Sequence, residues 1–150
     1  MAGSTRRNES HYTVTIGNTL NKVIVSHLRH SLASFNRVHA GHDRHKGLLI
    51  VLRTANKRII GGLVGGTYFG YLHIDVLWVD QHQRRRGHGE RLLNTAEQEA
   101  VRRGCRYAHL DTHGFQALDF YKKRGYKVVG ELTDLPPGDS RYLLRKVLKS

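Results

Sequence analysis

The sequence predicts a single domain over residues 1–150, of the α/β (α+β) class, with a central sheet packed against helices. A chain of 150 residues suits one domain, and its first ten residues are polar and predicted to be flexible. Tyr71–Val79 alternates with a period of two, as a strand with one buried face does. Glu90–Arg103 has apolar residues at helical spacing. The order of strands and helices around these two segments favours helices packed on a sheet.

The first third of the chain is predicted to contain one strand and one helix. His11–Ile16 alternates weakly and is predicted as the first strand. Asn18 or Thr19 can cap a helix that continues to Phe35. Residues 36–46 are rich in basic side chains and are predicted to form a loop.

A hairpin and an amphipathic strand are predicted for the centre of the sheet. Leu48–Leu52 and Ile59–Phe69 are strand candidates joined by a turn. In the next strand, His73 and Asp75 belong to a face with polar groups in its first half. The opposite face is assigned to the core because its residues are all apolar: Leu72, Ile74, Val76 and Trp78.

The second half of the chain alternates helices and strands. Gln81–Gly89 is predicted as a basic loop before the helix Glu90–Arg103, and Gly104 is a suitable residue to end that helix. The elements expected after it are a strand over Arg106–Asp111, a helix over Phe115–Arg124, and closing strands over Tyr126–Leu132 and Arg141–Val147.

The composition favours anionic partners. Lys and Arg number 25 against 12 acidic residues, which gives a net charge of +13. Such a chain attracts phosphorylated cofactors or nucleic acid, whereas polycationic substrates are disfavoured unless a local acidic pocket overrides the net field. A single cysteine, Cys105, excludes an internal disulfide and a Cys-rich zinc site. The longest uncharged stretch, Ile59–Ile74, is too short and too rich in glycine to span a membrane, so we expect a cytoplasmic protein without a membrane partner.

The segment Val79–Glu90 is the sharpest local feature of the sequence, because it joins a buried strand to the start of a helix. Gly87 and Gly89 leave room for the main chain to approach a ligand. Free N–H groups at the helix start and the three arginines Arg84, Arg85 and Arg86 add positive potential. Together these features predict a site for a pyrophosphate.

Two known phosphate motifs do not match this segment. No Gly-Lys-Ser/Thr follows, which excludes a P-loop, and Leu92 stands where the dinucleotide fingerprint requires its third glycine. A basic surface loop with a helix cap is the alternative interpretation.

Two motifs resemble the GNAT superfamily of acyl-CoA N-acyltransferases. Arg84, Gly87 and Gly89 match the family pattern Gln/Arg-x-x-Gly-x-Gly/Ala between its fourth strand and third helix. Residues 117–126 resemble the family's fourth helix and the turn after it, and the resemblance covers about residues 47–147. It implies a central twisted mixed sheet of about six or seven strands, in which the fourth and fifth strands splay apart.

The resemblance also implies roles for individual residues. Main-chain groups of Leu77 and Val79 would pair with the pantetheine amides of the cofactor. Tyr121 matches the tyrosine that protonates the departing thiolate, although a core aromatic is the alternative reading. Gly114 stands where many members have a cofactor-binding Asn, and Gln116 is a candidate substitute. The pyrophosphate would be held by N–H groups of Arg85, Arg86, Gly87, His88, Gly89 and Glu90.

The acceptor amine must lose a proton to become nucleophilic, so a base is useful. Asp75 is the main candidate, because it lies mid-strand beside His73, on the face opposite the core stripe, and the family often places an acid on this strand. The further acceptor-site candidates are His73, His109, Asp111 and His113. His39, His42 and His45 recur every three residues, but no carboxylate-rich signature accompanies them and no metal is expected.

The leading hypothesis is therefore an acetyl-CoA-dependent N-acetyltransferase that moves an acetyl group directly to a primary amine of a small molecule or peptide. Two alternatives stay open, namely acetylation of aminoacyl-tRNA, as in toxin members of the family, and a non-catalytic module that binds acyl-CoA or nucleic acid. The closing strands, with Tyr142, Leu143 and Leu144, could offer an edge for pairing in a homodimer, as the resemblance to the family implies.

Overall fold

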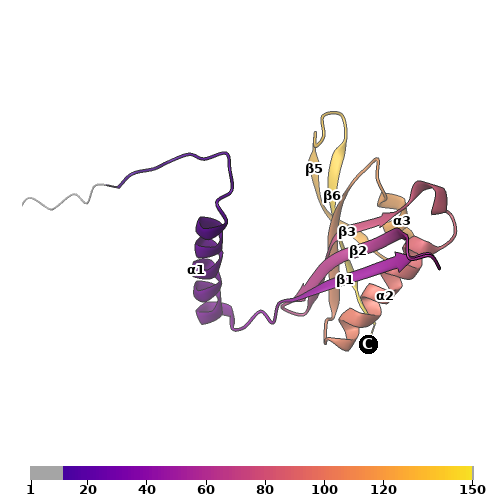
Figure 1. The fold of residues 1–150 in the computed structure, drawn as a ribbon, viewed down its shortest axis with the longest axis horizontal. Helices are drawn as coiled ribbons and strands as arrows, with labels where there is room; N and C mark the ends of the chain where they lie inside the picture. Colours follow the sequence, from indigo (N-terminus) through magenta and orange to yellow (C-terminus); the bar gives the residue numbers. More distant parts are fainter. Residues whose placement is uncertain (1–11, 150) are drawn as a thin grey trace, which may run out of the picture. The chain divides into compact units, whose positions relative to one another are not determined.

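The computed structural model describes residues 12–149, and the prediction of a flexible start over residues 1–10 lies outside them. The chain divides into two compact units, residues 1–41 and 42–150. Figure 1 traces the element order along the chain.

Over its described residues, 12–41, the first unit contains one helix, α1 (Lys22–Ala40). The Asn21 side chain caps it by accepting hydrogen bonds from the N–H groups of Val23 and Ile24 at 3.0 and 3.2 Å. The helix therefore begins later than predicted and continues through residues 36–40, which were expected to be a loop. The predicted strand His11–Ile16 is wrong for its described residues 12–16, which pair with no other strand of the described chain. Weak alternation alone supplies no partner for a strand's main-chain hydrogen bonds.

The second unit is built on a mixed sheet of six strands in the order β1-β2-β3-β4-β6-β5. Only the β3–β4 pair is parallel. This agrees with the expected sheet of six or seven strands. The strands are β1 (Lys46–Arg53), β2 (Ile59–Tyr68), β3 (Tyr71–Val79), β4 (Tyr107–His113), β5 (Lys127–Thr133) and β6 (Ser140–Val147). The helices of this unit are α2 (His88–Arg102) and the short α3 (Leu118–Lys123).

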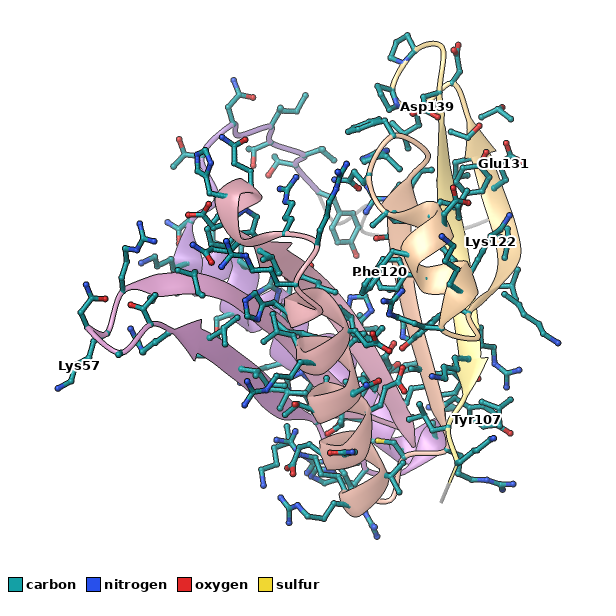
Figure 2. All side chains as sticks on the ribbon, turned by 90° about the vertical axis from the view of Figure 1, so that its right-hand side faces the viewer. Lys57, Tyr107, Phe120, Lys122, Glu131 and Asp139 are labelled. Atoms are coloured by element: carbon teal, nitrogen blue, oxygen red, sulfur yellow. The ribbon has the colours of Figure 1, made fainter. Side chains whose placement is uncertain are left out.

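The helix α2 covers one face of strands β1 to β3, and Figure 2 shows it running along them. Its apolar stripe packs into the core, as predicted, and four of its residues are buried: Leu92, Leu93, Ala96 and Ala100. They meet apolar side chains of the sheet, among them Leu63, Leu72, Ile74, Leu110 and Leu144. The face of the sheet that contacts α2 is therefore the buried one, and α2 does not cover the opposite face.

A bulge in β3 reverses the alternation that the sequence predicts. Gly65 of β2 pairs with Ile74 and Val64 pairs with Val76, so Asp75 has no partner of its own in β2. An extra residue in one strand moves every later side chain to the other face. Trp78 is consequently 47% exposed, as is Val76, and both of these core assignments are wrong.

Strands β3 and β4 separate within the sheet. They pair in parallel from Tyr71 and Tyr107 as far as Ile74 and Leu110, and no pairing continues beyond those residues. These two strands are the pair for which splaying was expected. The ends of β3 and β4 are therefore free to line a gap in the sheet.

Candidate active site

The turn between β3 and α2 is held in place by Asp80. The Asp80 side chain accepts a hydrogen bond from the N–H of His82 at 2.9 Å, and its own N–H donates to the Ile60 carbonyl at 2.8 Å. The residues that follow include Arg85 with φ 61° and Gly87 with φ 78°. Gly87 is the N-cap of α2, and its positive φ is a conformation that other residues adopt at a cost.

This turn presents a row of unpaired main-chain donors. The first hydrogen bond of α2 runs from the N–H of Arg91 to the carbonyl of Gly87 at 3.0 Å. Within residues 12–149, the N–H groups of residues 84–90 donate to no protein acceptor. Free N–H groups at a helix start form a site for anions. The arrangement fits the predicted pyrophosphate site over Arg85, Arg86, Gly87, His88, Gly89 and Glu90.

The arginines of the turn contribute in different ways. The Nε–H of Arg84 donates to the Val79 carbonyl at 3.0 Å, so this side chain also fastens the turn to the end of β3. Arg85 and Arg86 are exposed and free of ion pairs in the described chain. Their charge adds to the positive potential of the helix start.

A cavity of about 770 Å³ lies beside these donors. Its walls come from the end of β3, the β3–α2 turn, and the segment from Gly114 through α3. Leu77 and Val79 are among the lining residues. Because Asp80 bonds β2 and antiparallel pairing alternates, the main-chain groups of Leu77 and Val79 face away from β2 and into the gap. Such groups can pair with amides of an extended ligand, and of these groups the Val79 carbonyl already accepts the Nε–H of Arg84.

Phe120 of α3 and Arg124, the residue after α3, complete this wall, although neither was singled out from the sequence. A Cβ atom on Gly89 would lie 3.3 Å from the Phe120 ring, so this glycine makes room for an aromatic side chain. Figure 2 labels Phe120 on α3. The guanidinium of Arg124 stacks 3.8 Å above that ring and forms an ion pair with Glu90 at 3.4 Å. Nothing in the sequence relates Phe120 and Arg124 to Gly89 and Glu90, since the two pairs meet only in the folded chain.

Tyr121 belongs to the core and also lines the cavity. Its side chain is only 6% exposed and belongs to the core, where its ring meets Tyr126 edge-on at 5.6 Å. It also lines the cavity beside the α2 N-terminus. Burial raises the pKa of its phenol to about 12, so the group is fully protonated at neutral pH. A protonated phenol in this position can act as an acid.

Gly114 and Gln116 also lie at this cavity. A Cβ atom at Gly114 would lie 2.5 Å from an oxygen of Asp139, so the turn has no space for the Asn common in the family. The side-chain oxygen of Gln116 accepts hydrogen bonds from the N–H of His113 at 3.0 Å and from Thr112 at 3.3 Å. Gln116 thus fastens the end of β4 as well as lining the cavity.

Three of the four acceptor-site candidates gather on the sheet face opposite α2. The rings of His73 and His109 are 4.6 Å apart, on paired residues of β3 and β4. Asp111, two residues further on β4, forms an ion pair with Arg141 at 2.8 Å. The hydrogen bond from Arg141 holds the pKa of Asp111 below its usual value, which makes this carboxylate a weak base.

His113, the fourth acceptor-site candidate, has its contacts away from His73, His109 and Asp111. Its Nδ1 lies 3.1 Å from the Leu135 carbonyl, and its ring stacks on Phe115 at 5.3 Å. Both contacts connect the end of β4 to loops, and neither involves the other histidines.

Asp75 lies at a second cavity, of about 380 Å³, which it lines together with His73. Three more polar side chains share this cavity: His45, which belongs to the histidine series noted in the sequence, and Asp43 and Tyr68, which were not selected from the sequence. Asp75 is exposed and sits at the bulge of β3, two residues from Leu77 of the larger cavity. The two cavities therefore open at neighbouring points of one strand.

A third cavity, of about 870 Å³, is lined mainly by α2 and strands β5 and β6. Its buried carboxylate, Glu97, already accepts hydrogen bonds from Lys146 at 2.8 Å and from the Tyr126 hydroxyl at 3.0 Å. Its lining includes none of the residues of the β3–α2 turn with their free main-chain donors, and only Arg124 and Gly125 of the second motif reach it. We therefore place the candidate active site at the splayed strands.

Comparison with known proteins identifies the class to which this fold and turn belong. A profile of the Acetyltransferase (GNAT) family matches residues 20–126. An acetyltransferase of Agrobacterium fabrum, Atu2258, is 35% identical over 119 residues, which cover 79% of this chain and 87% of that protein. The chain belongs to the GNAT family, and it is an acyltransferase.

Two further acetyltransferases are similar to this chain. A blasticidin-S acetyltransferase of Streptomyces morookaense is 42% identical over 91 residues, which cover 60% of this chain and 67% of that protein. The crystal structure of an acetyltransferase from Bacillus cereus superposes with a TM-score of 0.80 and 32% identity, covering 89% of this chain and 98% of that chain.

Among residues 12–149, no helix is long and apolar enough to cross a membrane.

Proposed function

We propose that this chain is an acetyl-CoA-dependent N-acetyltransferase that acts on a primary amine of a small molecule or peptide. The observation that carries the proposal is the row of unpaired N–H groups at residues 84–90, beside a cavity that also contains the Tyr121 phenol. GNAT acetyltransferases use acetyl-CoA, and the free donors fit its pyrophosphate. Leu77 and Val79 would pair with the pantetheine portion.

The proposed reaction is direct transfer. The amine nitrogen attacks the thioester carbonyl, the C–S bond breaks, and the departing thiolate takes a proton from Tyr121. The second cavity, which contains Asp75, is a suitable place for the acceptor amine beside the thioester. Asp75 and Leu77 of the cofactor cavity are about 7 Å apart along an extended strand. Binding both substrates side by side supplies proximity, and the mechanism needs no covalent enzyme intermediate.

The acceptor we favour is a small cationic amine. The second cavity has two carboxylates, Asp43 and Asp75, and neither Lys nor Arg is among its lining residues. It is a local acidic pocket in a chain of net charge +13, and it favours an ammonium group over a phosphate. The relative named for blasticidin S supports the same class of acceptor.

The test is acetyl transfer by the purified protein, followed by release of free thiol from acetyl-CoA. The acceptors are blasticidin S, spermidine, a lysine-containing tripeptide and charged tRNA, each at low and high salt. We expect thiol release with at least one small amine, and release that persists at high salt. Release with charged tRNA alone, lost at high salt, would move the proposal to the tRNA alternative.

A double variant, Tyr121→Phe with Asp75→Ala, separates the enzyme from a non-catalytic binding module. We expect it to bind CoA and to release little thiol. If neither the wild-type protein nor the variant releases thiol with any acceptor, the proposed activity is wrong, whatever the affinity for CoA.

A further inference from the structure

Tyr68 and His109 form a hydrogen-bonded pair on the sheet face opposite α2. The Tyr68 hydroxyl lies 2.7 Å from Nε2 of His109, although the two residues are 41 positions apart in the chain. Neither the turn at residues 84–90 nor Tyr121 uses this pair. It joins a side chain of β2 to a side chain of β4 near the place where β3 and β4 separate.

The register of the sheet places this pair beside the acceptor cavity. Thr67 and Leu72 pair across β2 and β3 and are both buried on the α2 side, so their neighbours Tyr68 and His73 face the other side. His73 pairs with His109 one residue before the strands part. The pair is therefore at the base of the splay.

Tyr68 connects the acceptor cavity to His109. Tyr68 lines that cavity together with His73 and Asp75, whereas His109 is not among its lining residues. A proton released in the cavity can thus reach Nε2 of His109 through the Tyr68 hydroxyl, which is able to accept one proton while donating another.

The surroundings keep His109 able to accept a proton. Burial lowers the pKa of His109, and the nearby His73 lowers it further, while Asp111 of β4 opposes the shift. Tyr71 of β3 meets the His109 ring edge-on at 5.6 Å, and Arg145 of β6 pairs opposite His109 in the sheet. This lowered pKa favours the neutral imidazole at neutral pH.

We propose that Tyr68 and His109 form a relay that removes the proton from the acceptor ammonium, a role that rests on the proposed acetyl transfer. One proton of R–NH₃⁺ passes to the Tyr68 oxygen as the phenol proton passes to Nε2 of His109. The neutral amine then forms the new C–N bond as the C–S bond breaks. His109 returns its proton to solvent, so each turnover releases one proton.

The remaining proton transfers balance the step. The new amide nitrogen loses its second proton to solvent, and the thiolate receives one from Tyr121, which solvent then restores. Asp75 holds the ammonium in the cavity and is separate from the relay. Tyr68 acts on the acceptor proton directly, whereas His109 acts through Tyr68.

Two conservative variants and one matched control test the relay, with acetyl-CoA and the small amine from the panel above that gives the fastest thiol release. Tyr68→Phe removes the hydroxyl, and His109→Gln keeps a hydrogen-bonding group that cannot titrate. We expect kcat to fall by roughly 10²-fold in both, within the usual range for loss of a general base, with unchanged affinity for CoA. Tyr71→Phe, on the same sheet face, loses only a bond to Arg145 and should keep wild-type kcat.

The pH profile distinguishes a relay from a structural role. Wild-type kcat should fall as the pH drops through the pKa of His109, and this acid limb should disappear in His109→Gln. In Tyr68→Phe, activity should instead rise with pH as the acceptor amine deprotonates unaided. Variants that only melt earlier, while keeping the wild-type kcat and acid limb, would overturn the relay.

A second measurement needs no acceptor. The imidazole NMR signals of His109 should titrate at a different pH in Tyr68→Phe than in the wild-type protein, and an unchanged titration would overturn the relay. Absence of thiol release from the wild-type protein with every amine would overturn the proposed function instead, and the relay with it. An active wild-type protein with unaffected variants overturns the relay alone.

Discussion

The N–H of Arg91 donates to the carbonyl of Gly87 at 3.0 Å, and this is the first hydrogen bond of α2. Every N–H from residue 84 to residue 90 precedes that bond and has no acceptor within residues 12–149. The conformation of Gly87, with φ 78°, positions this row of unpaired N–H groups. Binding of an acyl-CoA pyrophosphate should therefore be sensitive to the geometry of one glycine.

Gly87→Ala should weaken CoA binding by more than its effect on stability explains. The new Cβ meets open space, so the cost is the left-handed conformation, about 1–2 kcal/mol of unfolding free energy. Gly104→Ala is the matched control, because Gly104 has φ 86°, open space around it and no place at the site. Denaturant melts should show similar losses for both variants, and calorimetry should show weaker CoA binding only for Gly87→Ala. Equal CoA affinities in the two variants would contradict this account.

Tyr121→Phe should reduce turnover by roughly 10²-fold while CoA affinity is retained. Because burial raises the pKa of Tyr121 to about 12, wild-type activity should show no alkaline loss from this group below that pH. Tyr126→Phe is the control: it removes a hydrogen bond to Glu97 and should cost about 1 kcal/mol of stability without altering kcat. A collapse of CoA affinity in Tyr121→Phe would mean that this residue serves packing or binding alone.

Acid should destabilise the protein partly through Glu99. Hydrogen bonds from Arg102 and then Arg103 lower the pKa of Glu99 from 4.5 to about 2. A lowered pKa in the folded state stabilises the protein above pH 4.5, and this contribution is lost as the pH falls toward about 2. Melting temperatures measured between pH 7 and pH 3 should therefore fall less steeply in Glu99→Gln than in the wild type. Glu131→Gln, at an exposed residue, should melt with the wild-type pH dependence, and the same slope in all three proteins would refute the assignment.

Gly114→Asn should destabilise the protein rather than improve cofactor binding. Asp139, labelled at the β5–β6 turn in Figure 2, accepts hydrogen bonds from the N–H groups of Phe115 at 3.1 Å and Ser140 at 2.7 Å, so its carboxylate cannot simply move away. We expect a loss of about 1–3 kcal/mol in denaturant melts. The double variant Gly114→Asn with Asp139→Ala should lose less unfolding free energy than the sum of the two single variants, because the second change removes the clash with the new side chain. A variant of wild-type stability that binds CoA more tightly would show that Asn is accommodated here.

The sequence alone was sufficient wherever a local pattern coincided with the folded environment. Tyr71–Val79 is a strand over its predicted length, and the stripe containing Leu92 and Leu93 faces the core. The start of α2 could also be placed to within two residues, because glycines and a charged turn mark it.

Where the prediction failed, a tertiary contact decided the outcome. The bulge at Asp75 follows from pairing with β2, so the alternation that assigned Trp78 to the core is broken by residues of another strand. Gly89 illustrates the same limit, because the space it provides is occupied by Phe120 from α3. Tyr68 and His109 are too far apart in the chain for any spacing rule to connect them.

The most direct test of the central claim is an amide NMR titration of the ¹⁵N-labelled protein with CoA and, separately, with pantetheine, which lacks the diphosphate. Capture of the pyrophosphate by main-chain donors predicts large shifts for the N–H signals of residues 85–90 with CoA and small shifts with pantetheine. Unmoved signals from those amides in the presence of saturating CoA would contradict the account.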